Sequence, residues 1–497
     1  MKTDASGNVT DFLFERADPD ALALRLLDAD YSYGQLRRAT RRMARHLWDS
    51  HAQPGDRALL LADNSLFWVA AYLGILRAGL VAVPLPAGTR PSELAHIRRH
   101  TDARFALVQR DVLVRHPECF AEMQVVTDAP PDACDDPVDL PPAPRSGNDL
   151  AAIMFTSGST GQPRGVMISH SNIIANTESI VEYLDLTGND RIMAVLPFHY
   201  CFGTSLLHTH LRVGASLVID PRFMYPELVL QRMIEERCTG FAGVPTHFQI
   251  LLRSAGFRKR QFPDLRYVQQ AGGRLAKPFL ADLRAVLPHT RIFVMYGQTE
   301  ATARLSYLPP EYLDTKPGSI GKAIPGVRLR VLDERGREVA PGEVGEIVAE
   351  GRNVARGYWR AARETAETFR DGKLHTGDLA TVDEDGFLYI VDRAKDFLKC
   401  RGERVGCRQI EDALLECEDL LEAAVIGVPD DVLGEAVQAF VVPRNGAAGG
   451  IAERLTLFCK ERLPAHLQPK QIVVLRSLPK NSAGKVVKSG LRDPCAR

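Results

Sequence analysis

The chain has 497 residues, too many for a single hydrophobic core, so its length predicts more than one domain. Apolar residues make up 45% and charged residues 25%, as in ordinary globular proteins. Lysine plus arginine and aspartate plus glutamate number 62 each, which argues against nucleic acid or an anionic membrane surface as a partner.

Two segments bear on location. Met1 to Thr10 is polar and lacks the apolar core of a signal peptide. The longest apolar run, Leu66 to Leu76, ends at Arg77 and is too short to span a bilayer, so we expect no transmembrane segment. The nine cysteines are scattered without a metal-binding pair, which favours free thiols and a cytoplasmic location.

The first part of the chain predicts a parallel α/β sheet. After Ser32, a helical pattern places Leu36, Met43 and Leu47 on one face. A strand at 58–62, a buried helix from 65 to about 79 and a strand at 81–85 have the spacing of a parallel unit. We expect further strands at 106–108, 124–126, 192–196, 217–219, 240–244, 267–268 and 292–295, and a helix at 172–184.

The pattern changes after Gly318. Short alternating strands at 327–332, 345–349 and 387–391 predict a small β-rich subdomain. Beyond them, a helix at 409–416 and strands at 423–428, 436–442 and 472–475 predict a compact α+β unit. We therefore predict an α/β fold with a large N-terminal domain (1–392) of parallel α/β layers plus the β-rich subdomain, a hinge (393–396) and a small C-terminal domain (397–497).

One glycine- and hydroxyl-rich segment lies between two apolar runs and predicts an anion-binding loop. Its glycines allow backbone N–H groups to face a ligand, and its hydroxyls add hydrogen-bond donors. Its arginine adds a positively charged, planar guanidinium group. The residues concerned are Thr156, Ser157, Gly158, Ser159, Thr160, Gly161 and Arg164. Without a Gly-Lys-Ser/Thr at the required spacing, it is not a Walker A loop.

Three other motifs hold candidate functional residues. Tyr296, Gly297, Gln298, Thr299 and Glu300 directly follow an apolar strand, where open α/β sheets bind ligands. Asp378 follows a tight glycine turn and suits a grip on two sugar hydroxyls. Lys485 lies in a loop near the C-terminus. Without further context, a Thr-Glu pair is more often part of a helix cap, an aspartate such as Asp378 is more often a turn residue, and a lysine such as Lys485 is more often solvated.

In order along the chain, these motifs resemble those of the AMP-forming adenylating enzymes: acyl-CoA synthetases, luciferases and peptide-synthetase adenylation domains. The phosphate loop, Tyr-Gly-x-Thr-Glu, Thr-Gly-Asp and the C-terminal lysine motif all match, and the resemblance is closest to acyl- or aryl-acid ligases. It extends from about Tyr31 to Lys485. One departure is Arg164, which stands where that family usually has lysine.

The resemblance implies roles around the nucleotide. Tyr296 would stack on adenine beside the glycine turn of Gly272, Gly273 and Arg274. Thr299 would bind the α-phosphate and Glu300 would help to hold Mg²⁺. Asp378 and Arg393 would bind the ribose.

The resemblance also implies catalytic and hinge roles. Lys485 would complete the adenylation site, because an ammonium relieves the repulsion between a carboxylate and an anionic phosphate, roughly 1 to 4 kcal/mol at about 4 Å. His199 would flank the substrate channel and Lys395 would be the hinge pivot. Lys399 and Gly402 would face the thiol in the second step, Gly402 in a pantetheine tunnel.

The acyl pocket would be formed mostly by apolar side chains, which favours an apolar acyl group. The residues that the resemblance places there are Tyr200, Cys201, Phe202, Gly203, Val244, Pro245, Phe248, Gln270 and Ala271.

The implied reaction uses ATP and Mg²⁺ to convert a carboxylic acid to an acyl-adenylate and then to a thioester. The expected acid is fatty or otherwise apolar, with an aryl acid as the alternative. Coenzyme A is the expected acceptor. Two alternatives stay open: transfer of an acyl or aminoacyl group to the phosphopantetheine of a carrier protein, and a catalytically inactive nucleotide-binding relative. The sequence leaves the oligomeric state undetermined.

Overall fold

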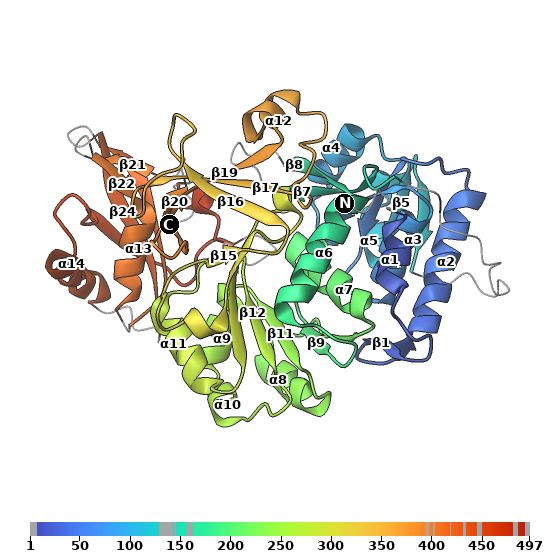
Figure 1. The fold of residues 1–497 in the computed structure, drawn as a ribbon, viewed down its shortest axis with the longest axis horizontal. Coiled ribbons are helices and arrows are strands. Elements are labelled where there is room, and N and C mark those ends of the chain that lie inside the picture. Colours follow the sequence, from blue (N-terminus) through green and yellow to red (C-terminus); the bar gives the residue numbers. More distant parts are fainter. Residues whose placement is uncertain are drawn as a thin grey trace.

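The computed structural model describes residues 7–128, 143, 146–156, 163–393, 397–400, 403–417, 419–430, 434–444, 450–480 and 486–492. They form four sheets with covering helices (Figure 1).

The N-terminal sheet has six strands. In spatial order they are β6 (Gln124–Thr127), β5 (Phe105–Val108), β3 (Arg57–Leu61), β4 (Val81–Leu85), β7 (Leu150–Thr156) and β8 (Arg164–Ser169). The strands run parallel except for the antiparallel pair β7–β8. Because β3 and β4 are buried on both faces, their sequences are almost continuously apolar. The predicted strand–helix–strand unit is confirmed.

The second sheet has nine strands. In spatial order they are β15 (Lys322–Ala323), β14 (Ser306–Leu308), β13 (Arg291–Tyr296), β12 (Tyr267–Gln270), β11 (Gly240–Gly243), β9 (Arg191–Ala194), β10 (Ser216–Ile219), β1 (Leu22–Arg25) and β2 (Asp30–Ser32). From β13 to β1 the neighbours are parallel, so the carboxyl ends of these strands lie at one edge.

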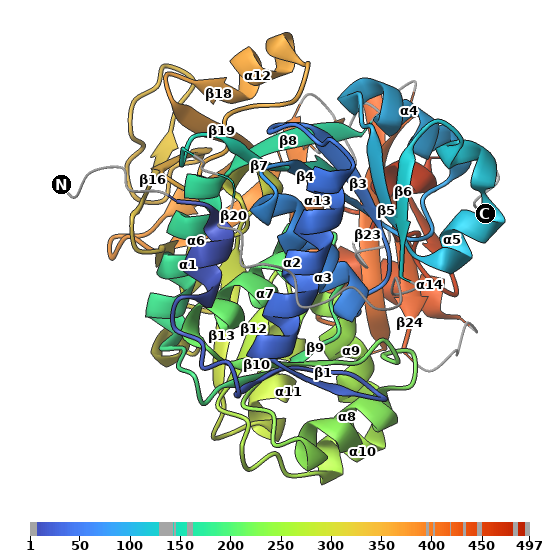
Figure 2. The ribbon, with the colours of Figure 1, turned by 90° about the vertical axis from the view of Figure 1, so that its right-hand side faces the viewer.

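Helices fill the space between these two sheets and cover their outer faces. They are α1 (Val9–Phe14), α2 (Tyr33–Asp49), α3 (Leu66–Arg77), α4 (Pro91–Thr101), α5 (Arg110–Arg115), α6 (His170–Leu184), α7 (Cys201–Val213), α8 (Pro226–Glu235), α9 (Pro245–Arg253), α10 (Ala255–Lys259) and α11 (Lys277–Val286). One core cluster joins residues of both sheets through α3, α6 and α7 (Figure 2). Ser32 begins α2 with a capping box and Ser65 caps α3, as the sequence predicts.

The third sheet is antiparallel and forms the β-rich subdomain. It contains β16 (Val327–Leu332), β17 (Gly345–Gly351), β19 (Lys373–Val382), β18 (Phe369–Arg370) and β20 (Leu388–Arg393), with α12 (Ala362–Thr368) beside it.

The C-terminal unit has its own sheet and core. The sheet contains β22 (Glu403–Gly406), β21 (Phe397–Cys400), β24 (Gly434–Pro443), β23 (Leu420–Asp430) and β25 (Gln471–Val474), with helices α13 (Cys407–Leu415) and α14 (Ile451–Arg462). The predicted α/β class with a small α+β C-terminal unit is confirmed. The boundaries at 392 and 397 stay a prediction, and 394–396 lie outside the described residues. No described helix is both long enough and apolar enough to cross a membrane.

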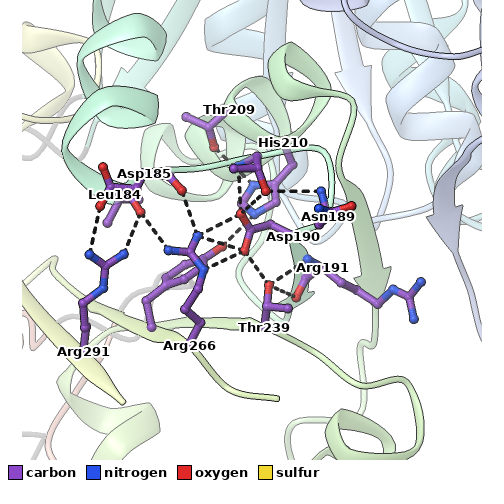
Figure 3. Close-up of polar contacts among 12 residues, drawn as sticks. Leu184, Asp185, Asn189, Asp190, Arg191, Thr209, His210, Thr239, Arg266 and Arg291 are labelled. Atoms are coloured by element: carbon purple, nitrogen blue, oxygen red, sulfur yellow. Dashed lines mark hydrogen bonds and ion pairs between the residues drawn. The ribbon is translucent and has the colours of Figure 1, made fainter. Parts of the chain in front are cut away.

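A polar network joins the amino ends of the parallel strands in the nine-stranded sheet (Figure 3). The Asp190 carboxylate before β9 accepts hydrogen bonds from Arg266 (2.8 Å) and from the Thr239 hydroxyl (2.8 Å). Arg266 also donates to the carbonyl of Asp185 at the end of α6 (3.1 Å), and Arg291 pairs with the Asp185 carboxylate (2.9 Å). This end of the sheet is therefore held by internal contacts, which leaves the opposite edge for ligands.

Candidate active site

Loops at the carboxyl edge of the nine-stranded sheet hold most of the predicted site residues. The loop after β9 contains His199, β11 leads into Val244 and Pro245, β12 into Ala271 and Gly272, and β13 into Gly297 and Gln298. Parallel strands bring these loops to one edge although they are far apart in the sequence.

Tyr296, Asp378 and Arg393 form a connected group. The Tyr296 hydroxyl at the end of β13 donates a hydrogen bond to Asp378 Oδ2 (2.6 Å), and Arg393 Nε is 3.0 Å from Asp378 Oδ1. Burial, and after it the Asp378 carboxylate, raises the pKa of Tyr296 well above its usual value. Strands from two sheets thus position an acceptor carboxylate between a neutral phenol and a cation.

Glu300, Tyr358 and Arg164 form a second group. The Tyr358 hydroxyl donates to Glu300 Oε1 (2.8 Å), and the Arg164 guanidinium carbon lies 5.6 Å from the centre of the Tyr358 ring. Burial, and then the Glu300 carboxylate, raises the pKa of Tyr358. A planar guanidinium stacks on an aromatic face better than an ammonium does, so Tyr358 gives a physical reason for arginine at position 164.

Thr299 and His199 each contact a residue of the predicted acyl pocket. The Thr299 hydroxyl donates to Cys201 Sγ at the start of α7 (3.4 Å). The His199 ring is 4.4 Å from the Tyr200 ring, and its Nε2 is buried without a hydrogen-bond partner among the described residues. Burial lowers the pKa of His199 to about 4, so its imidazole is neutral at physiological pH.

The predicted adenine-side turn lies against the C-terminal unit. Gly272 has a φ of +82°, a conformation that glycine adopts without strain. Arg274 forms an ion pair with Asp412 of α13, and burial with nearby Arg408 lowers the pKa of Arg274 to about 10. The structure thus places Arg274 at a contact between the two parts of the chain.

The predicted pocket residues divide into two groups. Phe202 and Val244 belong to the core cluster between the two sheets, and Ala271 with them. Phe248 instead packs edge-on against Phe241 (5.8 Å) in the core cluster beside α9. Gln270 is fully buried, and its Nε2 donates to the carbonyl of Gly273 (2.7 Å).

Several predicted residues lie outside the described part of the chain. They are Ser157, Gly158, Ser159, Thr160, Gly161, Lys395, Gly402 and Lys485. For Lys399 the structure describes only the backbone, in β21. The flanks of Lys485 meet in an antiparallel bridge between Lys480 and Val486, and those of the phosphate loop are the paired strands β7 and β8.

Sequence reasoning overlooked Tyr358 and Arg304. Tyr358 follows Gly357 in a segment without strong periodicity, and only its contact with Glu300 makes it a site residue. Arg304 is an arginine in an otherwise uncharged stretch four residues after Glu300, which was a usable signal.

The donor set fits a nucleotide. Asp378 offers a carboxylate for a sugar diol, and Arg393 and Arg164 offer positive charge. No cluster of three or more metal-ligating side chains occurs within the described residues, so a Mg²⁺ ion would rely on Glu300 together with phosphate oxygens and water. Such a metal would neutralise phosphate charge.

Comparison with known proteins agrees with this geometry. The AMP-binding enzyme family matches residues 13–359, and the AMP-binding enzyme C-terminal domain matches 409–485. The chain is 33% identical over 493 residues to a feruloyl-CoA synthase of Amycolatopsis sp., with 96% of each chain covered. It is 32% identical to the long-chain-fatty-acid–CoA ligase of Salmonella typhimurium, covering 88% of this chain and 85% of the relative. The crystal structure of ATP-bound MatB from Rhodopseudomonas palustris superposes with a TM-score of 0.90 at 31% identity and 98% coverage of both chains.

The chain therefore belongs to the AMP-binding enzyme family. Within that family it is an acid–thiol ligase of the acyl-CoA synthetase type, which uses ATP. The predicted class of enzyme is confirmed.

Proposed function

We propose that the enzyme activates an acid with a mainly apolar acyl group, aryl or aliphatic, and transfers it to coenzyme A. Two observations support the proposal: the contacts of Asp378 with Tyr296 and Arg393, which suit a nucleotide, and the hydrogen bond from Thr299 to Cys201 at the start of α7, where we expect the acyl pocket. The name of the feruloyl-CoA synthase relative supports an aryl acid, and that of the fatty-acid relative an aliphatic one.

The proposed reaction has two steps. In the first, a carboxylate oxygen of the acid bonds to the α-phosphorus of ATP, and the bond from that phosphorus to pyrophosphate breaks. In the second, the thiol sulfur bonds to the acyl carbon and AMP leaves with the bonding electrons. The mixed anhydride makes the acyl carbon reactive enough for thiol attack.

We assign the residues as follows. Asp378 and Arg393 hold the ribose, Tyr296 borders the adenine, and Thr299 binds the α-phosphate. Lys485 neutralises the two anions as they approach each other in the first step. In the second step the C-terminal unit turns about Lys395, which brings Lys399 and Gly402 to the thiol.

The test is pyrophosphate release from MgATP with a panel of fatty, aryl and amino acids, each with and without coenzyme A. We expect release with apolar acids, multiplied by coenzyme A. Acid-dependent pyrophosphate release that coenzyme A does not increase would favour the phosphopantetheine of a carrier protein as acceptor. Absence of pyrophosphate release with every acid would contradict the proposal and favour an inactive relative. Arg164→Lys would then test whether arginine at the family's usual lysine position is the cause.

We also propose a cytoplasmic location. The described cysteines Cys119, Cys201, Cys238, Cys407, Cys417 and Cys459 are free thiols, which suits a reducing compartment. Fractionation of cells that produce the tagged protein would test this.

A further inference from the structure

Arg304 lies inside the molecule, beside the predicted acyl pocket. It is 2% exposed and lies in the turn between Ala301 and β14. Its guanidinium carbon is 4.0 Å from the centre of the Phe202 ring, and Phe202 follows Cys201, whose thiol accepts the Thr299 hydrogen bond. A path of contacts therefore leads from the predicted α-phosphate residue along the start of α7 to a buried cation.

Arg304 differs from the other buried arginines of the described residues in its partners. Within the described ranges four arginines are buried, and three of them face a carboxylate. The paired ones are Arg77 with Asp11, Arg212 with Glu15, and Arg232 with Asp220. Within the described part of the chain Arg304 has no carboxylate partner, and its Nη2 has no hydrogen-bond partner at all.

The remaining polar contacts of Arg304 are with uncharged side chains. Its Nε is 3.4 Å from Met295 Sδ, and its other electrostatic neighbours are Tyr183 and Cys201. Burial of a cation without an anion is costly, and this cost favours a bound anion at Nη2. Burial also holds the pKa of Arg304 below its usual value.

A small cavity of about 10 Å³, with room for about one water molecule, lies at the start of α7. Cys201 and Ala303, the residues just before Phe202 and Arg304, line it. So do the polar side chains of Ser205 and His208. The chain neighbours of Phe202 and Arg304 are thus not fully packed on this side.

We propose that the acid carries a second carboxylate, distal to the reacting one, which pairs with Arg304. This inference rests on the proposed function and deepens it. The reacting carboxylate lies at Thr299, a short hydrocarbon or aryl spacer passes Cys201 and Phe202, and the distal carboxylate accepts hydrogen bonds from the guanidinium. One carboxylate forms the thioester, and the product keeps the other as a free anion.

The first experiment compares matched acids in the pyrophosphate-release assay with coenzyme A. Each aliphatic or aryl dicarboxylic acid is paired with its monomethyl ester and with the monocarboxylic acid of equal length. We expect at least about 100-fold higher kcat/KM for the diacids, since their analogues leave Arg304 unpaired.

The second experiment uses variants of the full-length enzyme. In Arg304→Met we expect about a 100-fold loss for the diacid, no loss for the monoacid, and an unchanged KM for ATP. Arg304→Lys should restore part of the diacid preference. Arg212→Met, which removes a buried arginine of α7 that is already paired with Glu15, should leave the ratio of diacid to monoacid unchanged.

Three outcomes would overturn the inference. Equal use of monoacids and diacids by the wild type would do so while upholding the proposed function. Equal loss for both acids in Arg304→Met would assign Arg304 to the nucleotide or to stability instead. Absence of release with every acid would overturn the proposed function and this inference together. If Arg304→Met does not fold, the wild-type preference and Arg304→Lys still decide.

Discussion

At the residue scale, Asp378 is the group on which the ribose assignment depends. It is 4% exposed, and its two oxygens face Tyr296 and Arg393. In Asp378→Asn we expect KM for ATP to rise roughly 10- to 100-fold, because charge-assisted hydrogen bonds to the sugar are lost. The ATP dependence of pyrophosphate release measures this.

The matched control is Asp383→Asn, in the turn before β20, where the carboxylate pairs with Lys316 (2.8 Å). It should change stability and leave KM for ATP unchanged. An unaltered KM in Asp378→Asn would contradict the ribose assignment.

In the proposed mechanism, Lys485 acts in only one of the two half-reactions. We expect Lys485→Ala to abolish acid-dependent adenylation and to spare thioester formation from a supplied acyl-adenylate, because only the first step brings two anions together. Single-turnover measurements of each half-reaction test this, with Lys480→Ala as control, since Lys480 pairs with Glu422 (2.9 Å). Equal loss in both steps would contradict the two-state mechanism.

At the element scale, α7 holds the predicted pocket wall in place through Gly203. A Cβ there would lie 2.0 Å from the carbonyl oxygen of Pro197, so alanine would push α7 away from the loop with His199. We expect Gly203→Ala to lower the free energy of unfolding by about 2 kcal/mol or more and to reduce activity. Urea unfolding measures the first effect. Gly88→Ala, where nothing lies within 4 Å, is the control, and equal stability of the two variants would refute the packing argument.

The Asp190 network stabilises the other end of the sheet. Asp190→Ala should cost about 2 kcal/mol of unfolding free energy, less than for a fully buried pair because Arg266 keeps part of its side chain in solvent. Asp264→Ala removes the exposed pair with Arg237 and should cost under about 1 kcal/mol. Chemical denaturation of both variants measures these losses of unfolding free energy. Equal losses would show that the Asp190 network stabilises the fold no more than an exposed ion pair does.

Helices that begin at a capping serine could be predicted from the sequence, whereas the buried helix α7, which has no side-chain cap, could not. Ser32 and Ser65 mark α2 and α3 clearly. By contrast, Phe202 to Val213 of α7 are all buried, so the helix has no polar face and no readable period. The four site motifs are local and could be predicted, but the contacts of Tyr358 with Glu300 and of Arg304 with Phe202 are created by the fold and could not.

At the scale of the whole molecule, the contact between the C-terminal unit and the nine-stranded sheet combines charge and apolar packing. Arg274 pairs with Asp412, and Leu421 and Phe440 share a core cluster with Phe279. If this contact favours adenylation, Asp412→Ala should slow that step by up to about 5-fold, the effect of a partly exposed ion pair, and should spare thioester formation.

Single-turnover rates of the two half-reactions test this. The control is Asp419→Ala, which removes the exposed pair with Arg454 inside the C-terminal unit. Parallel slowing of both steps, or of neither, would contradict a role for this contact.

The proposed nucleotide site is assembled from segments that are distant in the sequence, and this has a consequence for the lifetime of the protein. Tyr296, Asp378 and Arg393 meet only when two sheets have formed and docked. A ligand that binds this native arrangement and not the unfolded chain stabilises the fold, by about 2.7 kcal/mol at a hundred times its dissociation constant. The supply of ATP would then help to determine how often the chain unfolds and becomes accessible to proteases.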